Sequence, residues 1–233
     1  MKKILSLGHV LEDTEKANSV ALQSRRKEWL AKFEIAEKEA DIKQIHNMLT
    51  EVYEETIHIV KQGKYISDNG KPVELSSPDE MMRNTVFYIS PGSVEHIPAQ
   101  YETSVSVLLM DSIEAGKMLL EKGLNPIVLN MANRQNPGGG VHCGARAQEE
   151  SLFRRSNLFK SMYQFVSYGS EYGIQLRKEQ YPMDRNTGGV YTPNATVFRG
   201  TQKEGYPLLD EPYKLSYDKI PLRCREKLNF LRV

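Results

Sequence analysis

Cysteine is scarce in this chain, which has 233 residues and only two cysteines, Cys143 and Cys224. This scarcity excludes a disulfide framework, and the spacing of the two residues excludes a cysteine-based zinc site. The pair could form one disulfide, but two cysteines in a chain this long are more typical of reduced thiols in a cytosolic protein. The chain is also long enough to bury a core without such crosslinks.

Long apolar runs are missing as well. No stretch approaches the roughly 20 apolar residues that a membrane-spanning helix needs. The N-terminus carries two early lysines, but its apolar run is short and is followed at once by Glu12 and Asp13, so we identify no export signal. The sequence therefore predicts a soluble, cytoplasmic protein that does not associate with membranes.

An excess of charge of either sign is absent, because 31 Lys and Arg residues are balanced by 30 Asp and Glu residues. A dedicated nucleic-acid binder needs a net basic face to displace counterions from the phosphates. We therefore expect no direct nucleic-acid binding. A local cationic pocket for a phosphorylated small molecule is still compatible with this balance.

Proline does not occur before Pro72, so long helices are allowed in the first part of the chain. Between Thr14 and about Lys61, apolar residues recur three and four positions apart. The stripe consists of Trp29, Phe33, Ala36, Ala40, Ile45, Leu49, Val52, Thr56 and Ile59. This pattern predicts a helical layer that packs on the core, with a separate partner-binding arm as the alternative.

After Gly63, Asn69-Gly70 and Pro72, short apolar runs alternate with helical segments. Their β-branched and aromatic residues predict strands at Thr85–Ser90, Ser104–Leu109, Pro126–Met131 and Thr196–Arg199. A helix is predicted over Asp111–Lys122, with Asp111 as its N-cap and Gly123 as its stop. Strand, helix and strand in this order predict a βαβ unit with parallel neighbours, and hence an α/β fold.

The segment Leu129–Leu152 holds the most informative pattern. A buried-looking strand enters a loop rich in Asn, followed by Pro137 and by three consecutive glycines, Gly138, Gly139 and Gly140, and a helix then begins near Ala145. Such glycines allow positive φ and close approach of a ligand, and amides at a strand–loop–helix junction favour an anion. The loop lacks the features of a P-loop or a dinucleotide-binding loop, so a plain turn is the alternative.

Two adjacent carboxylates, Glu149 and Glu150, follow Gln148 just inside this helix. Complementarity with the helix dipole would by itself explain such a pair. Beside an anion-binding loop, however, carboxylates are repulsive unless they accept hydrogen bonds from ribose hydroxyls or donate a proton. Helix geometry turns the two side chains about 100° apart, so they can reach different atoms of one sugar. His142, inside the loop, is more typical of a polar loop residue than of a catalytic base.

At these residues the chain resembles a known family. Three glycines, seven residues and then Gln-Glu-Glu are similar to the signature of macrodomain-type poly(ADP-ribose) glycohydrolases of the bacterial type. The segments that resemble this family, in its own order, are ETIHIVKQGKY, LNMANRQNPGGG, GARAQEESLFRRSNLF, GGVYTPNATVFRG and LLDEPYKLS. The resemblance covers roughly Glu51–Ser216. It implies an α/β, macrodomain-like mixed sheet flanked by helices, in which residues 1–75 are a helical extension packing on the core and 76–216 are the catalytic domain.

The resemblance also implies an activity, the glycosidase-type hydrolysis of ADP-ribose polymers without a cofactor or a metal. Glu150 would be the general acid that protonates the leaving oxygen, and Glu149 would hold ribose hydroxyls. The residues implied to bind substrate are Asn133, Asn136, Gly138, Gly139, Gly140 and Gln148. The expected ligand is ADP-ribose, poly(ADP-ribose) or an ADP-ribosylated protein.

After Ser216 the chain departs from the family pattern, which continues into another core strand, further helices and a second glycine-rich loop. Here Tyr217–Val233 is basic and contains no glycine, and Pro221 removes one backbone donor. We therefore expect a fold shortened at its C-terminal end, with 217–233 as a divergent tail that lies on the surface rather than in the sheet. Two alternatives to an active enzyme follow, namely an ADP-ribose-binding module without turnover and a truncated gene product.

Overall fold

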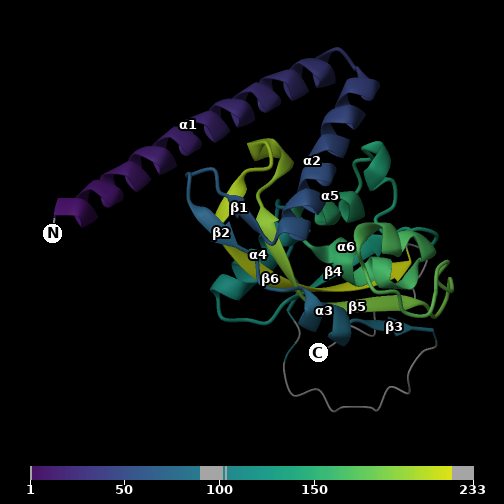
Figure 1. Ribbon diagram of the computed structural model, residues 1–233. Coiled ribbons are helices and arrows are strands. Elements are labelled where there is room, and N and C mark those ends of the chain that lie inside the picture. Colours follow the sequence, from purple (N-terminus) through teal and green to yellow (C-terminus); the bar gives the residue numbers. More distant parts are fainter. Residues whose placement is uncertain (1, 90–101, 103, 222–233) are drawn as a thin grey trace.

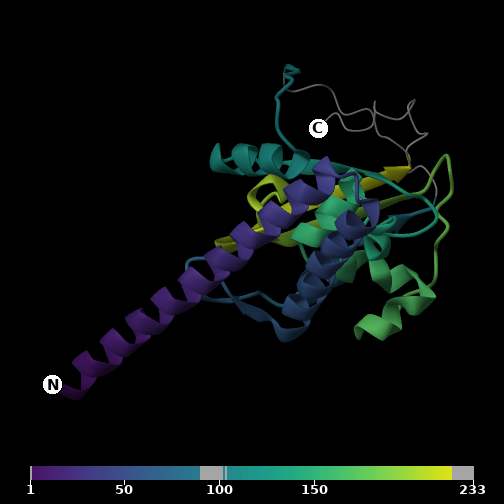
Figure 2. The ribbon, with the colours of Figure 1, turned by 90° about the horizontal axis from the view of Figure 1, so that it is seen from above.

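The computed structural model describes residues 2–89, 102 and 104–221, and two helices form its N-terminal part. Helix α1 spans Lys2–Lys38 and helix α2 spans Ile42–Gln62. Figures 1 and 2 show α1 projecting away from the other elements and α2 returning to them. None of the described helices is long and apolar enough to cross a membrane.

The apolar stripe predicted for these helices is confirmed. From Phe33 to Ile59 its members are buried, with the exception of Ala40, which has a φ of 54° in the turn between the helices. Helix α2 begins after Asp41, whose side chain accepts a hydrogen bond from the Gln44 N–H, and it ends at Gly63 in the left-handed conformation with a φ of 70°. Helix α2 therefore packs on the core, while the last turns of α1 pack against α2 in a separate apolar cluster that includes Tyr206.

A small antiparallel hairpin of β1 (Lys64–Ile66) and β2 (Pro72–Glu74) follows. The sequence indicated only a break in the helical pattern here. Alternation within such short strands buries one side chain of each, Tyr65 and Val73. Both belong to the main hydrophobic core, so the hairpin is continuous with the rest of the fold.

The main sheet has the strand order β3 (Val86–Tyr88), β5 (Gly189–Arg199), β6 (Leu208–Pro221) and β4 (Ile127–Ala132). Strand β5 is antiparallel to both β3 and β6, whereas β4 is parallel to β6. The sheet is therefore mixed and flanked by helices, as the sequence led us to expect. The predicted strands at Thr85–Ser90, Pro126–Met131 and Thr196–Arg199 correspond to β3, β4 and the end of β5.

Strand β6 corrects the expectation for the C-terminal segment. The chain does not leave the sheet after Ser216, because 216–221 pairs with β4 and continues the central strand. Tyr217 and Lys219 are both fully buried, at 0% exposed. The surface prediction was wrong for 217–221 because alternate residues from Leu215 face the core, and Pro221 stands at the strand's end. Residues 222–233, including Cys224, lie outside the described residues.

The strand predicted at Ser104–Leu109 was also wrong. This segment has no regular structure, and Val105, Val107 and Leu109 are exposed. The predicted βαβ unit is therefore absent from the described part of the chain, and β4 takes β6 as its parallel neighbour instead. The helix prediction was right, since α4 (Ser112–Glu121) begins at the capping residue Asp111.

The core lies between the sheet and the helices that cover it. Helix α4 packs on β4 and β6, α5 (Gln148–Arg155) on β4 and β5, and α3 (Asp79–Asn84) and α6 (Leu158–Met162) on β5.

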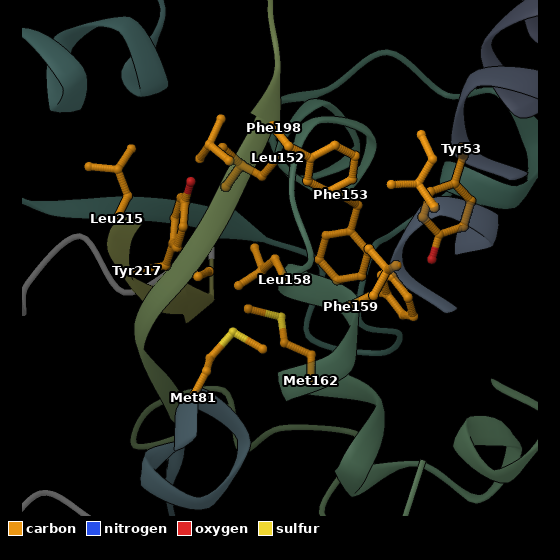
Figure 3. Close-up of a cluster of buried hydrophobic side chains, with 14 of the residues drawn as sticks. Tyr53, Met81, Leu152, Phe153, Leu158, Phe159, Met162, Phe198, Leu215 and Tyr217 are labelled. Carbon is orange, nitrogen blue, oxygen red and sulfur yellow. The ribbon is translucent and has the colours of Figure 1, made fainter. Parts of the chain in front are cut away.

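The described residues also form four short 3₁₀ helices, η1 (Val141–Cys143), η2 (Tyr163–Phe165), η3 (Ser167–Tyr172) and η4 (Gln202–Glu204). Figure 3 shows side chains of α5 and α6 facing those of the strands; they include Leu152, Phe153, Leu158, Phe159, Phe198, Leu215 and Tyr217. This packing fixes α5, and with it Glu149 and Glu150, against the sheet.

Candidate active site

The glycine-rich loop connects the end of β4 to the start of α5. Gly138 and Gly139 have positive φ values, 81° and 55°, which L side chains rarely adopt. A Cβ on Gly138 would lie 2.7 Å from the Phe153 ring, and one on Gly139 would overlap the Glu150 carboxylate. The glycines are therefore required by the loop's own packing, and close approach of a ligand is not needed to explain them.

Glu149 joins three parts of the structure. Its side chain is buried, and its Oε1 accepts hydrogen bonds from the Gly138 N–H at 3.1 Å and from Lys219 Nζ at 2.6 Å. Its Oε2 accepts a hydrogen bond from the Asn133 N–H at 3.0 Å. The carboxylate thus ties the end of β4, the glycine-rich loop and strand β6 together.

Glu150 is held on one side only. Its Oε1 accepts a hydrogen bond from the Gly140 N–H at 2.8 Å. Its Oε2 makes no hydrogen bond with any described residue. The side chain is 6% exposed, while Gly139 and Gly140 beside it are half-buried. Glu150 therefore combines a fixed position with one oxygen that is available to another molecule.

Gln148 binds the edge of β4 that pairs with no strand of the described residues. Its Oε1 accepts a hydrogen bond from the Met131 N–H at 2.9 Å, and its Nε2 donates to the Leu129 carbonyl at 2.8 Å and to Ser112 Oγ at 2.9 Å. The carboxamide thus takes the place of a strand and fastens the first turn of α5 to β4.

Arg154 anchors the far side of the loop. It is 1% exposed, and its guanidinium donates to the carbonyls of Leu49 in α2 and Ala145 in the loop. Burial lowers the pKa of Arg154 from its usual value. The loop is therefore fixed by three charged side chains of α5, namely Glu149, Glu150 and Arg154.

The remaining polar residues predicted for the site lie on the surface of the loop. Asn133 is exposed, and its Oδ1 accepts a hydrogen bond from the Gln135 N–H at 2.8 Å. Asn136 is also exposed, and its side chain makes no hydrogen bond with any described residue. His142 Nε2 lies 2.9 Å from the Tyr163 hydroxyl, against the aromatic core, which is the position of a polar loop residue.

Sequence reasoning missed Lys219, and with it a buried polar cluster. Its ammonium lies 5.0 Å from the centre of the Tyr181 ring. Burial lowers the pKa of Lys219, and the carboxylates of Glu149 and Glu150 oppose that shift. Asn130, its neighbour in β4, is fully buried, and neither amide atom has a hydrogen-bond partner in the described part of the chain. The alternation through Leu215, Tyr217 and Lys219 could have indicated the strand, but no local signal joins Lys219 to Glu149.

The site offers carboxylates and amides rather than a metal-binding group. Among the described residues, no three His, Cys, Asp or Glu side chains are grouped so that they could hold a metal ion. Both oxygens of Glu149 accept hydrogen bonds from the protein, while Oε2 of Glu150 has no partner among the described residues. Such a pair allows one group to stay fixed while the other donates and accepts a proton.

Residues 53–200 match the microbial-type poly(ADP-ribose) glycohydrolase (PARG) catalytic domain. This match spans more than half of the chain and includes the glycine-rich loop together with Glu149 and Glu150. The chain belongs to this family. No curated protein matches the chain.

Solved structures of bacterial PARG are similar to this one. The PARG of Thermomonospora curvata is 25% identical with a TM-score of 0.57, and the match covers 75% of this chain and 64% of that chain. The same protein bound to the inhibitor ADP-HPD is 24% identical with a TM-score of 0.57, covering 75% and 63%. The PARG of Deinococcus radiodurans in complex with ADP-ribose is 24% identical with a TM-score of 0.46, covering 64% and 59%. The chain therefore spans less than two thirds of the length of these PARG chains.

Proposed function

We propose that this PARG-family chain hydrolyses poly(ADP-ribose) and releases ADP-ribose, with Glu150 as the general acid. The observation that carries the assignment is the asymmetry of the Glu150 carboxyl group. One oxygen is fixed by the Gly140 N–H and the other has no partner among the described residues. A proton on the free oxygen would thus be held in a defined position beside the half-buried Gly139 and Gly140, from which a substrate oxygen would take it.

The reaction requires one proton donor and one water. The bond between the anomeric carbon and the leaving oxygen breaks as Glu150 gives its proton to that oxygen, through an oxocarbenium-like state. Water then adds to the anomeric carbon, and the Glu150 carboxylate takes up the proton that the water loses. The acid is therefore regenerated, and its contribution to the rate is about 10²–10⁴-fold.

Glu149 supports this reaction from a fixed position. A carboxylate has about four lone-pair sites, and three are taken by the Asn133 and Gly138 N–H groups and by Lys219. We propose that the remaining site accepts one ribose hydroxyl. Because both polar atoms of the Gln148 carboxamide bind β4, we propose that Gln148 orients α5 rather than binding substrate.

We propose that the exposed amides of Asn133 and Asn136 bind the ribose that is cleaved. The three glycines would line the diphosphate and ribose through their Cα groups. Their N–H groups already donate within the loop, to Glu149, to the Asn136 carbonyl and to Glu150. In this proposal residues 1–75 are a helical extension of the catalytic domain.

The direct test is to incubate the purified chain with poly(ADP-ribose) and to measure released ADP-ribose by chromatography, with ADP-ribose binding followed by calorimetry. We expect both release and binding. Binding without release would identify an ADP-ribose-binding module instead. If neither occurs in a chain that is folded by circular dichroism, the proposed function is refuted.

A further inference from the structure

Lys219 has the most deeply buried charge in the described part of the chain, at 0% exposed. A buried ammonium is costly unless it is paired and hydrogen-bonded. Within the described residues its ion-pair partner is Glu149, at 2.6 Å. The two residues come from β6 and α5, so this pair joins two elements that are far apart in the sequence.

We propose that Lys219 is a positioning residue, whose ammonium holds the Glu149 carboxylate against the N–H groups of Asn133 and Gly138. Lys219 thereby fixes the glycine-rich loop, which also binds Glu150. The expected effect of Lys219 on turnover rests on the proposed function. Its effect on the loop follows from the contacts alone. Glu149 Oε1 accepts hydrogen bonds from Lys219 Nζ and the Gly138 N–H, and its Oε2 accepts one from the Asn133 N–H.

The other groups around this pair cannot replace Lys219. Tyr181, in the loop between η3 and β5, lies beside the ammonium. Burial raises the pKa of Tyr181 well above the usual value, so its hydroxyl is neutral. Tyr168 in η3 is neutral as well, because burial raises its pKa to about 12. Arg154 is the nearby cation on the side of Glu150, but it donates to backbone carbonyls.

Loss of the ammonium would leave Glu149 and Glu150 as adjacent, buried carboxylates. A buried carboxylate without a counter-ion is costly, so Glu149 would lose its fixed position. A displaced Glu149 carboxylate would no longer accept from both the Asn133 and the Gly138 N–H groups. The loop would then loosen at its first turn, while the bond between Gly140 and Glu150 would persist.

The decisive variant is Lys219→Met, which keeps the length of the side chain and removes its charge. The matched control is Lys214→Met, which changes an exposed lysine of the same strand. Amide hydrogen exchange measured by NMR should become at least about 10-fold faster at Gly138 and Asn133 and stay unchanged at Gly140. Because a displacement of about 1 Å can cost 10²-fold in rate, kcat should fall by about 10-fold or more with little change in KM.

The exchange and activity readouts separate two kinds of failure. A wild-type chain without hydrolase activity, together with faster exchange at Gly138 in Lys219→Met, would refute the proposed function and support the positioning role. Wild-type exchange at Gly138 and Asn133 with unchanged kcat would overturn the positioning role. If Lys219→Met does not fold, the double variant Glu149→Gln with Lys219→Met removes both charges. Exchange at Gly138 and Asn133 equal to that of the wild type in this double variant would also overturn the proposal.

Discussion

Glu149 and Glu150 are adjacent in sequence, yet they hold opposite ends of the glycine run, Glu149 through the Gly138 N–H and Glu150 through the Gly140 N–H. This arrangement follows from the turn of about 100° between consecutive helical side chains. Gly139 lies between the two attachment points, with no room for a Cβ beside Glu150. The two carboxylates therefore bind one loop but differ in freedom, because Glu150, unlike Glu149, keeps an oxygen with no partner among the residues that the structure describes.

Glu150→Gln should abolish release of ADP-ribose while leaving ADP-ribose binding largely intact. The amide keeps the shape and the oxygen that accepts from the Gly140 N–H, but it cannot donate a proton as an acid. We expect turnover to fall by about 10²–10⁴-fold, measured as ADP-ribose released from polymer. Glu211→Gln, at an exposed position of β6, is the matched control. Unchanged turnover in Glu150→Gln would show that another group is the acid.

Gly139→Ala should displace the Glu150 side chain and reduce turnover without unfolding the chain. Gly63→Ala is a suitable control, because Gly63 also has positive φ but has no atom within 4 Å of its Cβ position. Both variants should lose roughly 1–2 kcal/mol of stability from the backbone conformation. Activity should fall in Gly139→Ala alone. Equal activities in the two folded variants would mean that the overlap with Glu150 has no functional effect.

Gln148→Met should destabilise the fold and loosen the start of α5. The variant loses an acceptor for the Met131 N–H and two donor contacts, to Leu129 and Ser112. At about 1 kcal/mol net for each hydrogen bond, urea unfolding should show a loss of about 2–3 kcal/mol. Gln135→Met, at an exposed loop position, should cost far less. Similar losses in both variants would argue that Gln148 does not hold the edge of β4.

Asp218→Asn should stabilise the protein at neutral pH but hardly at acidic pH. Burial raises the pKa of Asp218 from its usual value, so the folded chain binds this proton more tightly than the unfolded chain does. The free energy of unfolding therefore falls as the pH rises from about 3.9, the ordinary value for Asp, through the raised pKa. Thermal melts of both proteins at pH 3.5 and pH 7 should show this difference.

Asp184→Asn is the control of opposite sign. The pKa of Asp184 is lowered by hydrogen bonds, first from the Asn186 N–H and then from Thr187. Its contribution to stability is therefore present above the ordinary Asp pKa and is lost as the pH falls through the lowered one. This variant should be less stable than the wild type at pH 7. A neutral-pH loss of stability in Asp218→Asn would contradict the assignment of Asp218 as a destabilising buried acid.

Capping residues and apolar spacing, which are read from neighbouring positions in the sequence, correctly predicted several helices. Asp111 starts α4 through its own side chain, and the stripe from Phe33 to Ile59 packs as its spacing indicated. The strand prediction at Ser104–Leu109 was wrong because β-propensity reflects how well a side chain fits a half-buried pleated surface. This segment packs on no such surface among the described residues, and its apolar side chains are exposed. The place of Lys219 could not be predicted, because it depends on the pairing of β4 with β6. The carboxylates of the site were therefore predictable, but the cation that pairs with Glu149 was not.

The central place of β6 has a consequence for the order of events during protein synthesis. Strands β4 and β5 leave the ribosome first, yet each needs β6 as a neighbour before the sheet can close. Contacts between distant segments form slowly because loop closure must come first. Until β6 is synthesised, β5 has an unpaired edge, and Glu149 cannot form its ion pair with Lys219. The carboxylate pair and the sheet are thus completed by the same strand, so a growing chain cannot assemble this site before it has closed its core.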